Sequence, residues 1–301
     1  MSGRTWAELP HDADLKRART IHHVIEVLHE DRVSSLDDVR ESARTLDVPA
    51  LAGASSFRVT AHREGEHAFS TDALAGAVGA ALQRRHGTPV DLNNFQVHVR
   101  ADLYGSRLIV GVQRTSKDLS KRIRRPQPLR TAVKASIAAS MLRLVGAHAS
   151  TGTLCDPMCG SGTILVEACE TNPSLRVLGF DWDDDTVEIA RGTVANHALQ
   201  IPIAPLEISD LSARVGPTLD FVITDPPYGI RRGRRMRLDD FYTTMLDSIH
   251  RATTKCSRVA IISPRVKAMQ KALANSPLTA DRVIQVRAGG LTPHIWVLSK
   301  T

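Results

Sequence analysis

The second half of the chain alternates short apolar runs with longer amphipathic stretches, and this pattern restricts the possible folds more than any other feature. Seven runs have the length and composition of strands: residues 151–156, 175–181, 203–208, 219–224, 258–263, 281–287 and 294–299. The first five gaps have room for helices, which predicts parallel strands joined by helical crossovers. The last gap is too short for a crossover helix, so the final two strands must run antiparallel. We therefore expect an α/β fold in which a doubly wound, seven-stranded, mostly parallel sheet closes with an antiparallel hairpin.

The first half of the chain has an α+β pattern instead. Its predicted elements are strands over 57–63, 95–101 and 107–113 and helices over 37–46 and 71–86. Residues 21–28 fit a strand or a short helix, and Tyr104-Gly105 is a plausible hairpin turn. Pro126-Gln127-Pro128 interrupts both patterns and is the candidate linker, before a helix predicted over 131–144. We expect an α+β domain over 1–125 and an α/β domain over 126–301.

A glycine-rich segment, DPMCGSGT at 156–163, follows the first predicted strand of the α/β half and opens a helix. Gly160 and Gly162 allow a tight turn and a close approach of the backbone to a ligand. Asp181 ends the next strand, where an acid can bind ribose hydroxyls. A dinucleotide and S-adenosylmethionine both suit this arrangement, and a packing turn is the alternative. Leu165 replaces the third glycine of the dinucleotide pattern, which counts against a dinucleotide.

A second segment, Asp225-Pro226-Pro227-Tyr228-Gly229, follows the apolar run 219–224. Two prolines stiffen the chain as it leaves the strand and hold an acid beside an aromatic ring. The carboxylate can accept a hydrogen bond from an amine, and the ring can stack on a planar base. The segment could also be an ordinary acidic turn. Asp225, Pro226, Pro227 and Tyr228 are our candidate catalytic residues.

The chain of 301 residues carries a net charge of +7, and much of the excess is clustered. One cluster comprises Lys121, Arg122, Arg124 and Arg125, and the other comprises Arg231, Arg232, Arg234, Arg235 and Arg237. Such clusters suit phosphates, so both are candidate RNA-binding residues, although a solvated surface would have the same composition.

The remaining composition excludes several classes. The four cysteines, at 155, 159, 169 and 256, form no C-x-x-C pair, so we expect free thiols and no metal site. No run of apolar residues is long enough to span a membrane, and the first residues lack the apolar segment of a signal peptide. A cytoplasmic location is expected.

Together the two motifs resemble those of Rossmann-fold methyltransferases that act on exocyclic amines of nucleobases, with S-adenosylmethionine as methyl donor. The resemblance implies that Asp156 lies near the methionine portion of the cofactor, that Asp181 binds its ribose and that Trp182 packs on its adenine. It implies that Asp210, after the third strand of the α/β half, contacts the adenine amine. Adding the loop itself, the candidate cofactor-binding residues are Asp156, Cys159, Gly160, Gly162, Thr163, Asp181, Trp182 and Asp210.

The first half also resembles a known module. HAFSTDALAGAVGAAL at 67–82 and VDLNNFQVHVRADLYGSRLIVGVQRTSKDLSKR at 90–122 are similar to a THUMP domain, an RNA-binding module. THUMP followed by this methyltransferase type implies an enzyme that makes N2-methylguanosine in tRNA. Methylation of an rRNA guanine or another nucleobase amine, or RNA binding without catalysis, are the alternatives. Family members usually carry a longer ferredoxin-like region before THUMP than the residues that precede it here.

Overall fold

A computed structural model of the protein describes residues 3–10, 13–127, 132–228, 230–231, 234–235, 237–287, 290 and 292–300. The chain divides into two compact units, Met1–Asp118 and Leu119–Thr301. The division falls before the expected boundary at 125/126, because the segment after Asp118 packs on the second unit. Among the described residues, no helix is long and apolar enough to cross a membrane.

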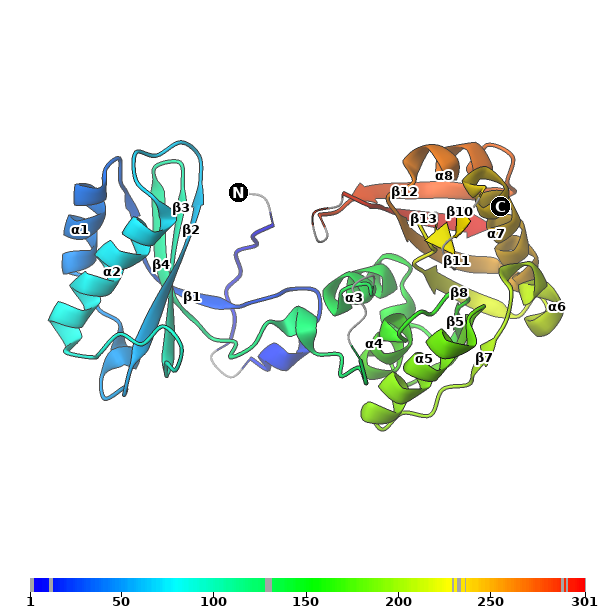
Figure 1. Ribbon diagram of the computed structural model, residues 1–301, viewed down its shortest axis with the longest axis horizontal. Helices are drawn as coiled ribbons and strands as arrows, with labels where there is room; N and C mark the ends of the chain where they lie inside the picture. The colour runs from blue at the N-terminus through cyan, green and yellow to red at the C-terminus, as the bar shows by residue number, and fades with distance from the viewer. Residues whose placement is uncertain are drawn as a thin grey trace. The chain divides into compact units, whose positions relative to one another are not determined.

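The first unit is a four-stranded sheet with two helices packed side by side on one face (Figure 1). Its elements are β1 (Ile25–Arg32), α1 (Leu36–Arg44), β2 (Phe57–Glu64), α2 (Thr71–His86), β3 (Val97–Tyr104) and β4 (Arg107–Gln113). The strand order is β1-β4-β3-β2, in which β2 and β3 run parallel and the other neighbours run antiparallel. Of the two possibilities for residues 21–28, the strand is found, and it begins at Ile25.

Local signals explain the limits of these elements. The Ser70 side chain accepts a hydrogen bond from the Ala73 N–H and begins α2, and Gly87 ends it in the left-handed conformation. The helical spacing of Leu74, Val78 and Leu82 places all three in the core. Gly105 has a φ of 56° in the turn between β3 and β4, where the sequence predicted a hairpin.

The second unit contains a seven-stranded sheet of order β12-β13-β11-β8-β5-β6-β7. Its strands are β5 (Gly152–Asp156), β6 (Leu175–Asp181), β7 (Ile203–Pro205), β8 (Leu219–Thr224), β11 (Thr253–Ser263), β12 (Leu278–Gln285) and β13 (His294–Lys300). Its α-helices are α3 (Ala135–Leu144), α4 (Thr163–Thr171), α5 (Asp184–Asn196), α6 (Leu211–Val215), α7 (Leu238–Ala252) and α8 (Val266–Leu273). A two-residue ladder, β9 (Ile230–Arg231) with β10 (Arg234–Arg235), precedes α7.

Helices cover both faces of this sheet (Figure 1). One core cluster joins α3, α4 and α5 to strand residues such as Leu154 and Ile223, and another joins α6, α7 and α8 to their neighbours Cys155 and Val222. Strands β11, β8, β5, β6 and β7 run parallel, whereas β13 lies antiparallel between β11 and β12. The predicted doubly wound sheet, its five crossover helices and its final antiparallel hairpin are confirmed.

Residues 119–127, which we call the strap, fasten the start of the second unit to α4 and α5. Arg122 makes a two-pronged ion pair with Glu167 of α4, at 2.6 and 2.7 Å. Ile123 is buried in the core of this unit. The backbone N–H of Arg124 donates to His197 Nε2 at 2.9 Å, just beyond α5. Residues 119–125 of the strap therefore pack as part of the second unit.

Candidate active site

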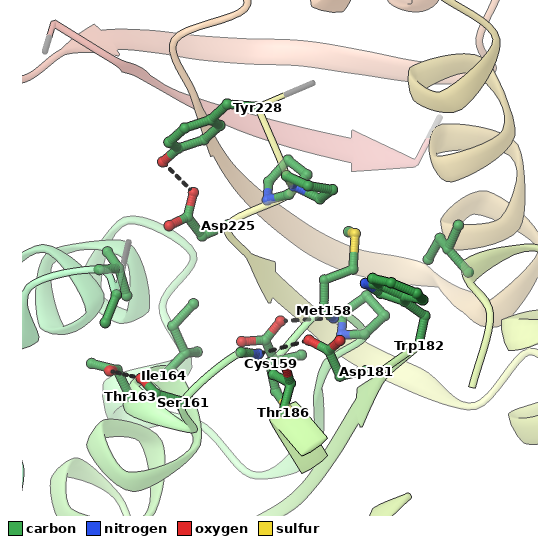
Figure 2. Close-up of a pocket in the computed structure, with 18 of the residues that line it drawn as sticks. Met158, Cys159, Ser161, Thr163, Ile164, Asp181, Trp182, Thr186, Asp225 and Tyr228 are labelled. Atoms are coloured by element: carbon green, nitrogen blue, oxygen red, sulfur yellow. Dashed lines mark hydrogen bonds between the residues drawn. The ribbon is translucent and has the colours of Figure 1, made fainter. Parts of the chain in front are cut away.

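The carboxyl ends of β5, β6 and β8 meet at one edge of the sheet. The chain crosses to opposite sides of β5 in forming β6 and β8, and ligands bind in the crevice that such a reversal opens. A cavity of about 550 Å³ lies here, within the range of small-molecule sites. Its lining includes Asp156, Pro157, Met158, Cys159, Gly160, Ser161, Thr163, Ile164, Asp181, Trp182, Thr186, Leu206, Ile208, Asp225, Pro226, Pro227, Tyr228, Phe241 and Arg265. The two motifs predicted from the sequence thus face a single cavity (Figure 2).

The glycine-rich loop is held in place by hydrogen bonds to the end of β6. The Gly160 N–H donates to Asp181 Oδ2 at 2.9 Å, and the Cys159 N–H donates to the Phe180 carbonyl at 2.8 Å. Asp156 Oδ1 accepts from the Met158 N–H at 3.2 Å, which closes the loop on itself. These contacts hold the Asp156 and Asp181 carboxylates at the cavity, and Figure 2 shows Asp181 close to Cys159 of the loop.

Two predicted cofactor residues lie outside the residues that line the cavity. Gly162 has a φ of 80° and begins α4, and a Cβ there would lie 3.3 Å from the Ala190 carbonyl oxygen of α5. Its role is to let the loop turn and α4 pack closely on α5. Asp210 is exposed, and Leu206 and Ile208 from the same segment line the cavity instead.

The Asp225–Tyr228 corner, which follows β8, has a defined geometry. The Tyr228 hydroxyl donates to Asp225 Oδ1 at 2.6 Å and so holds one carboxylate oxygen in place. Arg265 Nε donates to the Tyr228 carbonyl at 2.7 Å and so anchors the corner to the segment between β11 and α8. Pro226 and Pro227 also line the cavity, next to Asp225.

Three carboxylates share this cavity, and their burial disfavours the ionised form. Burial raises the pKa of Asp156 to about 8, and the charges of Asp181 and Asp225 add to the effect. Burial also raises the pKa of Asp225 to about 7, against the lowering effect of the Tyr228 hydrogen bond. The pKa of Asp181 rises for the same reason. A positively charged ligand would relieve this crowding, and S-adenosylmethionine carries both a sulfonium and an ammonium group.

The two predicted basic clusters have different surroundings. In the first, Lys121 and Arg124 are exposed, whereas Arg122 is committed to the buried Glu167. Arg125 is half-buried and donates to Ser161 and Thr163 of the loop, so it contacts the candidate cofactor site. In the second cluster, Arg237 is exposed and pairs with Asp240 at 3.0 Å. Arg232 and the side chains of Arg231, Arg234 and Arg235 lie outside the described residues.

Several lining residues were not predicted. Phe241, Arg265 and Thr186 come from elements that only the folded chain brings to the cavity, and no local pattern marks them. Ser161 and Met158 stand inside the glycine-rich motif, so the motif itself could have indicated them. Among the described residues, no group of three or more His, Cys, Asp or Glu side chains could hold a metal ion.

Comparisons with known proteins agree with this arrangement. Residues 122–294 match the family model of the RMKL-like methyltransferase domain, and residues 33–113 match the THUMP domain. The tRNA (guanine(6)-N2)-methyltransferase of Thermus thermophilus is 35% identical over 295 residues, covering 97% of this chain and 84% of that protein. The human tRNA (guanine(6)-N(2))-methyltransferase THUMP3 is 29% identical, and this chain spans 56% of its length.

A solved structure extends the likeness to three dimensions. The crystal structure of TrmN from Thermus thermophilus matches with a TM-score of 0.84 and 31% identity, over 99% of this chain and 88% of that one. The matches cover both units, and they include the residues of the cavity. The chain therefore belongs to the family of methyltransferases that join a THUMP domain to an RMKL-like methyltransferase domain.

Proposed function

We propose that this protein transfers the methyl group of S-adenosylmethionine to the exocyclic N2 amine of a guanine in tRNA. The observation that carries the proposal is that the glycine-rich loop with Asp181 and the Asp225–Tyr228 corner open into one cavity. A methyl donor and an acceptor amine can therefore meet without crossing solvent.

The residues at the floor of the cavity fit the cofactor. Asp181 would hold the ribose hydroxyls and the half-buried Trp182 would pack on adenine, while Asp156 would face the charged methionine portion. S-adenosylmethionine supplies an already activated methyl group. The protein has to position the acceptor amine and stabilise the positive charge that develops on it.

Asp225 is placed to do this. A guanine amine is a poor nucleophile because its lone pair is delocalised into the ring. Asp225 and the carbonyl of Pro226 can accept the amine hydrogens, align the nitrogen and favour its positive charge. Tyr228 holds one carboxylate oxygen in place, and its ring offers a stacking surface for a base that has left its helical stack. Only ionised Asp225 can act in this way, so turnover should rise as the pH passes through about 7.

The RNA would be bound by the THUMP unit together with Lys121, Arg124 and the cluster at 231–237. Relatives from bacteria, archaea and mammals are named for guanine 6 of tRNA, and we infer the same position here. A tRNA substrate also fits a cytoplasmic location.

The test is transfer of labelled methyl groups to tRNA, followed by nuclease digestion and mass analysis. We expect N2-methylguanosine at position 6. Replacing Asp225 with Asn should slow single-turnover transfer on the order of 100-fold and flatten the pH dependence, with cofactor affinity retained. Labelled product other than N2-methylguanosine, or a D225N variant as fast as the wild type, would refute the proposal.

A further inference from the structure

Arg265 lines the cavity beside the Asp225–Tyr228 corner and is exposed to solvent. Its Nε donates to the Tyr228 carbonyl at 2.7 Å, and its backbone N–H donates to Ser263 Oγ at 3.0 Å. Ser263 is fully buried at the end of β11 and is hydrogen-bonded to the Tyr242 hydroxyl of α7 at 2.5 Å. The backbone of Arg265 is thus held against the core, while its side chain reaches the corner.

Exposure increases from the glycine-rich loop to the mouth of the cavity. Asp156 and Asp181, beside the loop, are 1% and 6% exposed. Asp225 and Tyr228 are half-buried, and Figure 2 shows them across the cavity from Asp181. Arg265, which is bonded to Tyr228, is exposed. A base held at the corner would keep its ribose and phosphates on the side of Arg265, because the RNA chain must continue into solvent.

The charges at the cavity also favour a phosphate near Arg265. Among the described residues that line the cavity, three are acids and Arg265 is the cation. RNA is a polyanion, so a nucleotide that enters brings its phosphates toward a largely acidic site, and a cation at the mouth offsets the repulsion. A guanidinium has five N–H donors, and the Tyr228 carbonyl accepts from one of them. The same side chain can therefore also donate to a phosphate, whose geometry matches its planar fork.

We propose that Arg265 binds a phosphate adjoining the target guanosine and holds the Asp225–Tyr228 corner at the same time. The inference rests on the proposed function and adds a substrate-binding residue to it. Tyr228 connects the two tasks, because its carbonyl accepts from Arg265 Nε and its hydroxyl donates to Asp225 Oδ1 at 2.6 Å. Phosphate binding and placement of the carboxylate go through one residue, which favours a nucleotide within an RNA chain over a free base.

The experiment uses a tRNA assembled from two strands, with the target guanosine in a short synthetic strand. A neutral methylphosphonate replaces the phosphate on the 5′ side of this guanosine in one substrate and on the 3′ side in another. For the wild-type enzyme, we expect one of these replacements to lower kcat/KM about 10- to 100-fold, as loss of a charge-assisted hydrogen bond implies. Arg265→Gln should lower kcat/KM on the all-phosphate RNA by a similar factor. In that variant the same methylphosphonate should lower kcat/KM by less than about 3-fold more, because the interacting pair is already broken.

Two further variants and one binding measurement complete the design. Arg265→Lys keeps the charge without the planar fork, so its sensitivity to the methylphosphonate should fall between those of the wild type and Arg265→Gln. Arg251→Gln is the matched control, because this exposed arginine precedes β11 and so lies at the amino ends of the parallel strands, away from the cavity. It should respond to the methylphosphonates as the wild type does. Arg265→Gln should bind S-adenosylhomocysteine as tightly as the wild type, which shows that its fold and cofactor site are intact.

A purely structural role of Arg265 would give a different result. If Arg265→Gln lowered kcat/KM by the same factor on all three RNAs, Arg265 would hold only the corner, and the phosphate contact would be overturned. Neutral linkages without effect on the wild-type enzyme would overturn it as well. Failure of the wild-type enzyme to methylate the all-phosphate tRNA would instead overturn the proposed function.

Discussion

In the ligand-free protein, ionisation of Asp156 lowers the free energy of unfolding, because this carboxyl is fully buried close to two further carboxylates. Its pKa is about 8 in the folded chain, far above its ordinary value of 3.8, so the folded state holds the proton more tightly than the unfolded state. The resulting stabilisation is complete below about pH 4 and disappears as the pH rises through about 8. Asp225, with a pKa of about 7, contributes in the same direction.

Replacing Asp156 with Asn should therefore stabilise the ligand-free protein in alkaline solution while weakening cofactor binding. We expect the free energy of unfolding to rise by about 2–4 kcal/mol near pH 9, with little change near pH 4, because Asn never ionises. Denaturant titrations at both pH values measure the difference. A variant whose stability has the same pH dependence as the wild type would show that Asp156 is not the responsible group.

Site residues could be predicted from the sequence where their partners lie in the same motif or at the end of a neighbouring predicted strand. Asp225 and Tyr228 are held together by a three-residue spacing, and Gly160 meets Asp181 because the glycine-rich motif follows the end of β5 while Asp181 ends the neighbouring parallel strand β6. Arg122 and Arg125 could not be placed from charge alone. A run of basic residues has the same composition whether it is an exposed cluster or packs against a helix. Only the folded structure shows that Arg122 pairs with Glu167 of α4.

The strap shows how one short segment supports an element. Glu167 in α4 is fully buried, and Arg122 is 17% exposed, so the pair is largely removed from water. Such a pair contributes little over an apolar replacement, but removing one partner leaves an isolated buried charge. Its presence fixes where the strap meets α4 and thereby where Arg125 reaches the loop.

Replacing Arg122 with Ala should reduce the free energy of unfolding by about 3–5 kcal/mol, because Glu167 is left without its main partner. Arg124→Ala, at an exposed neighbouring position, should change it by no more than about 0.5 kcal/mol. The double replacement Arg122→Met with Glu167→Leu should recover most of the loss. Denaturant titration measures all three. If Arg122→Ala changed the free energy of unfolding only slightly and flattened the salt dependence of RNA binding, Arg122 would be an RNA-binding residue instead.

Elements with strong local signals were predicted to within a residue or two. Helix 71–86 has a serine cap and a terminal glycine, and strands 175–181 and 219–224 are compact apolar runs. The strand predicted over 203–208 ends at Pro205, although the Leu206 N–H still donates to the Asp181 carbonyl at 2.8 Å, and Ile208 begins a short 3-10 helix. Strand β11 begins at Thr253, before the predicted 258. Thr253 already pairs with Leu219 of β8, and after an irregular, polar segment the regular pairing continues from Arg258.

For the whole molecule, the strap determines where the chain can be divided. A fragment of residues 119–301 should fold and bind S-adenosylhomocysteine about as well as the full chain. A fragment of 126–301 should not, because it loses Arg122 and Ile123 and exposes the core side of α4. Circular dichroism and calorimetry on the two fragments check this. Equal binding by both would support the boundary at 125/126 that the sequence suggested.

The position of β13 has a consequence for how the protein is made. This strand lies between β11 and β12, yet it follows every other described strand in the chain. On the ribosome, β12 emerges without its neighbour, and buried residues such as Trp296 and Leu298 are not yet available to cover the core. The sheet can close only after residues near 300 have left the exit tunnel, so folding of this unit should wait for the last described strand. Until then, β11 presents an unpaired edge, which other extended chains can pair with.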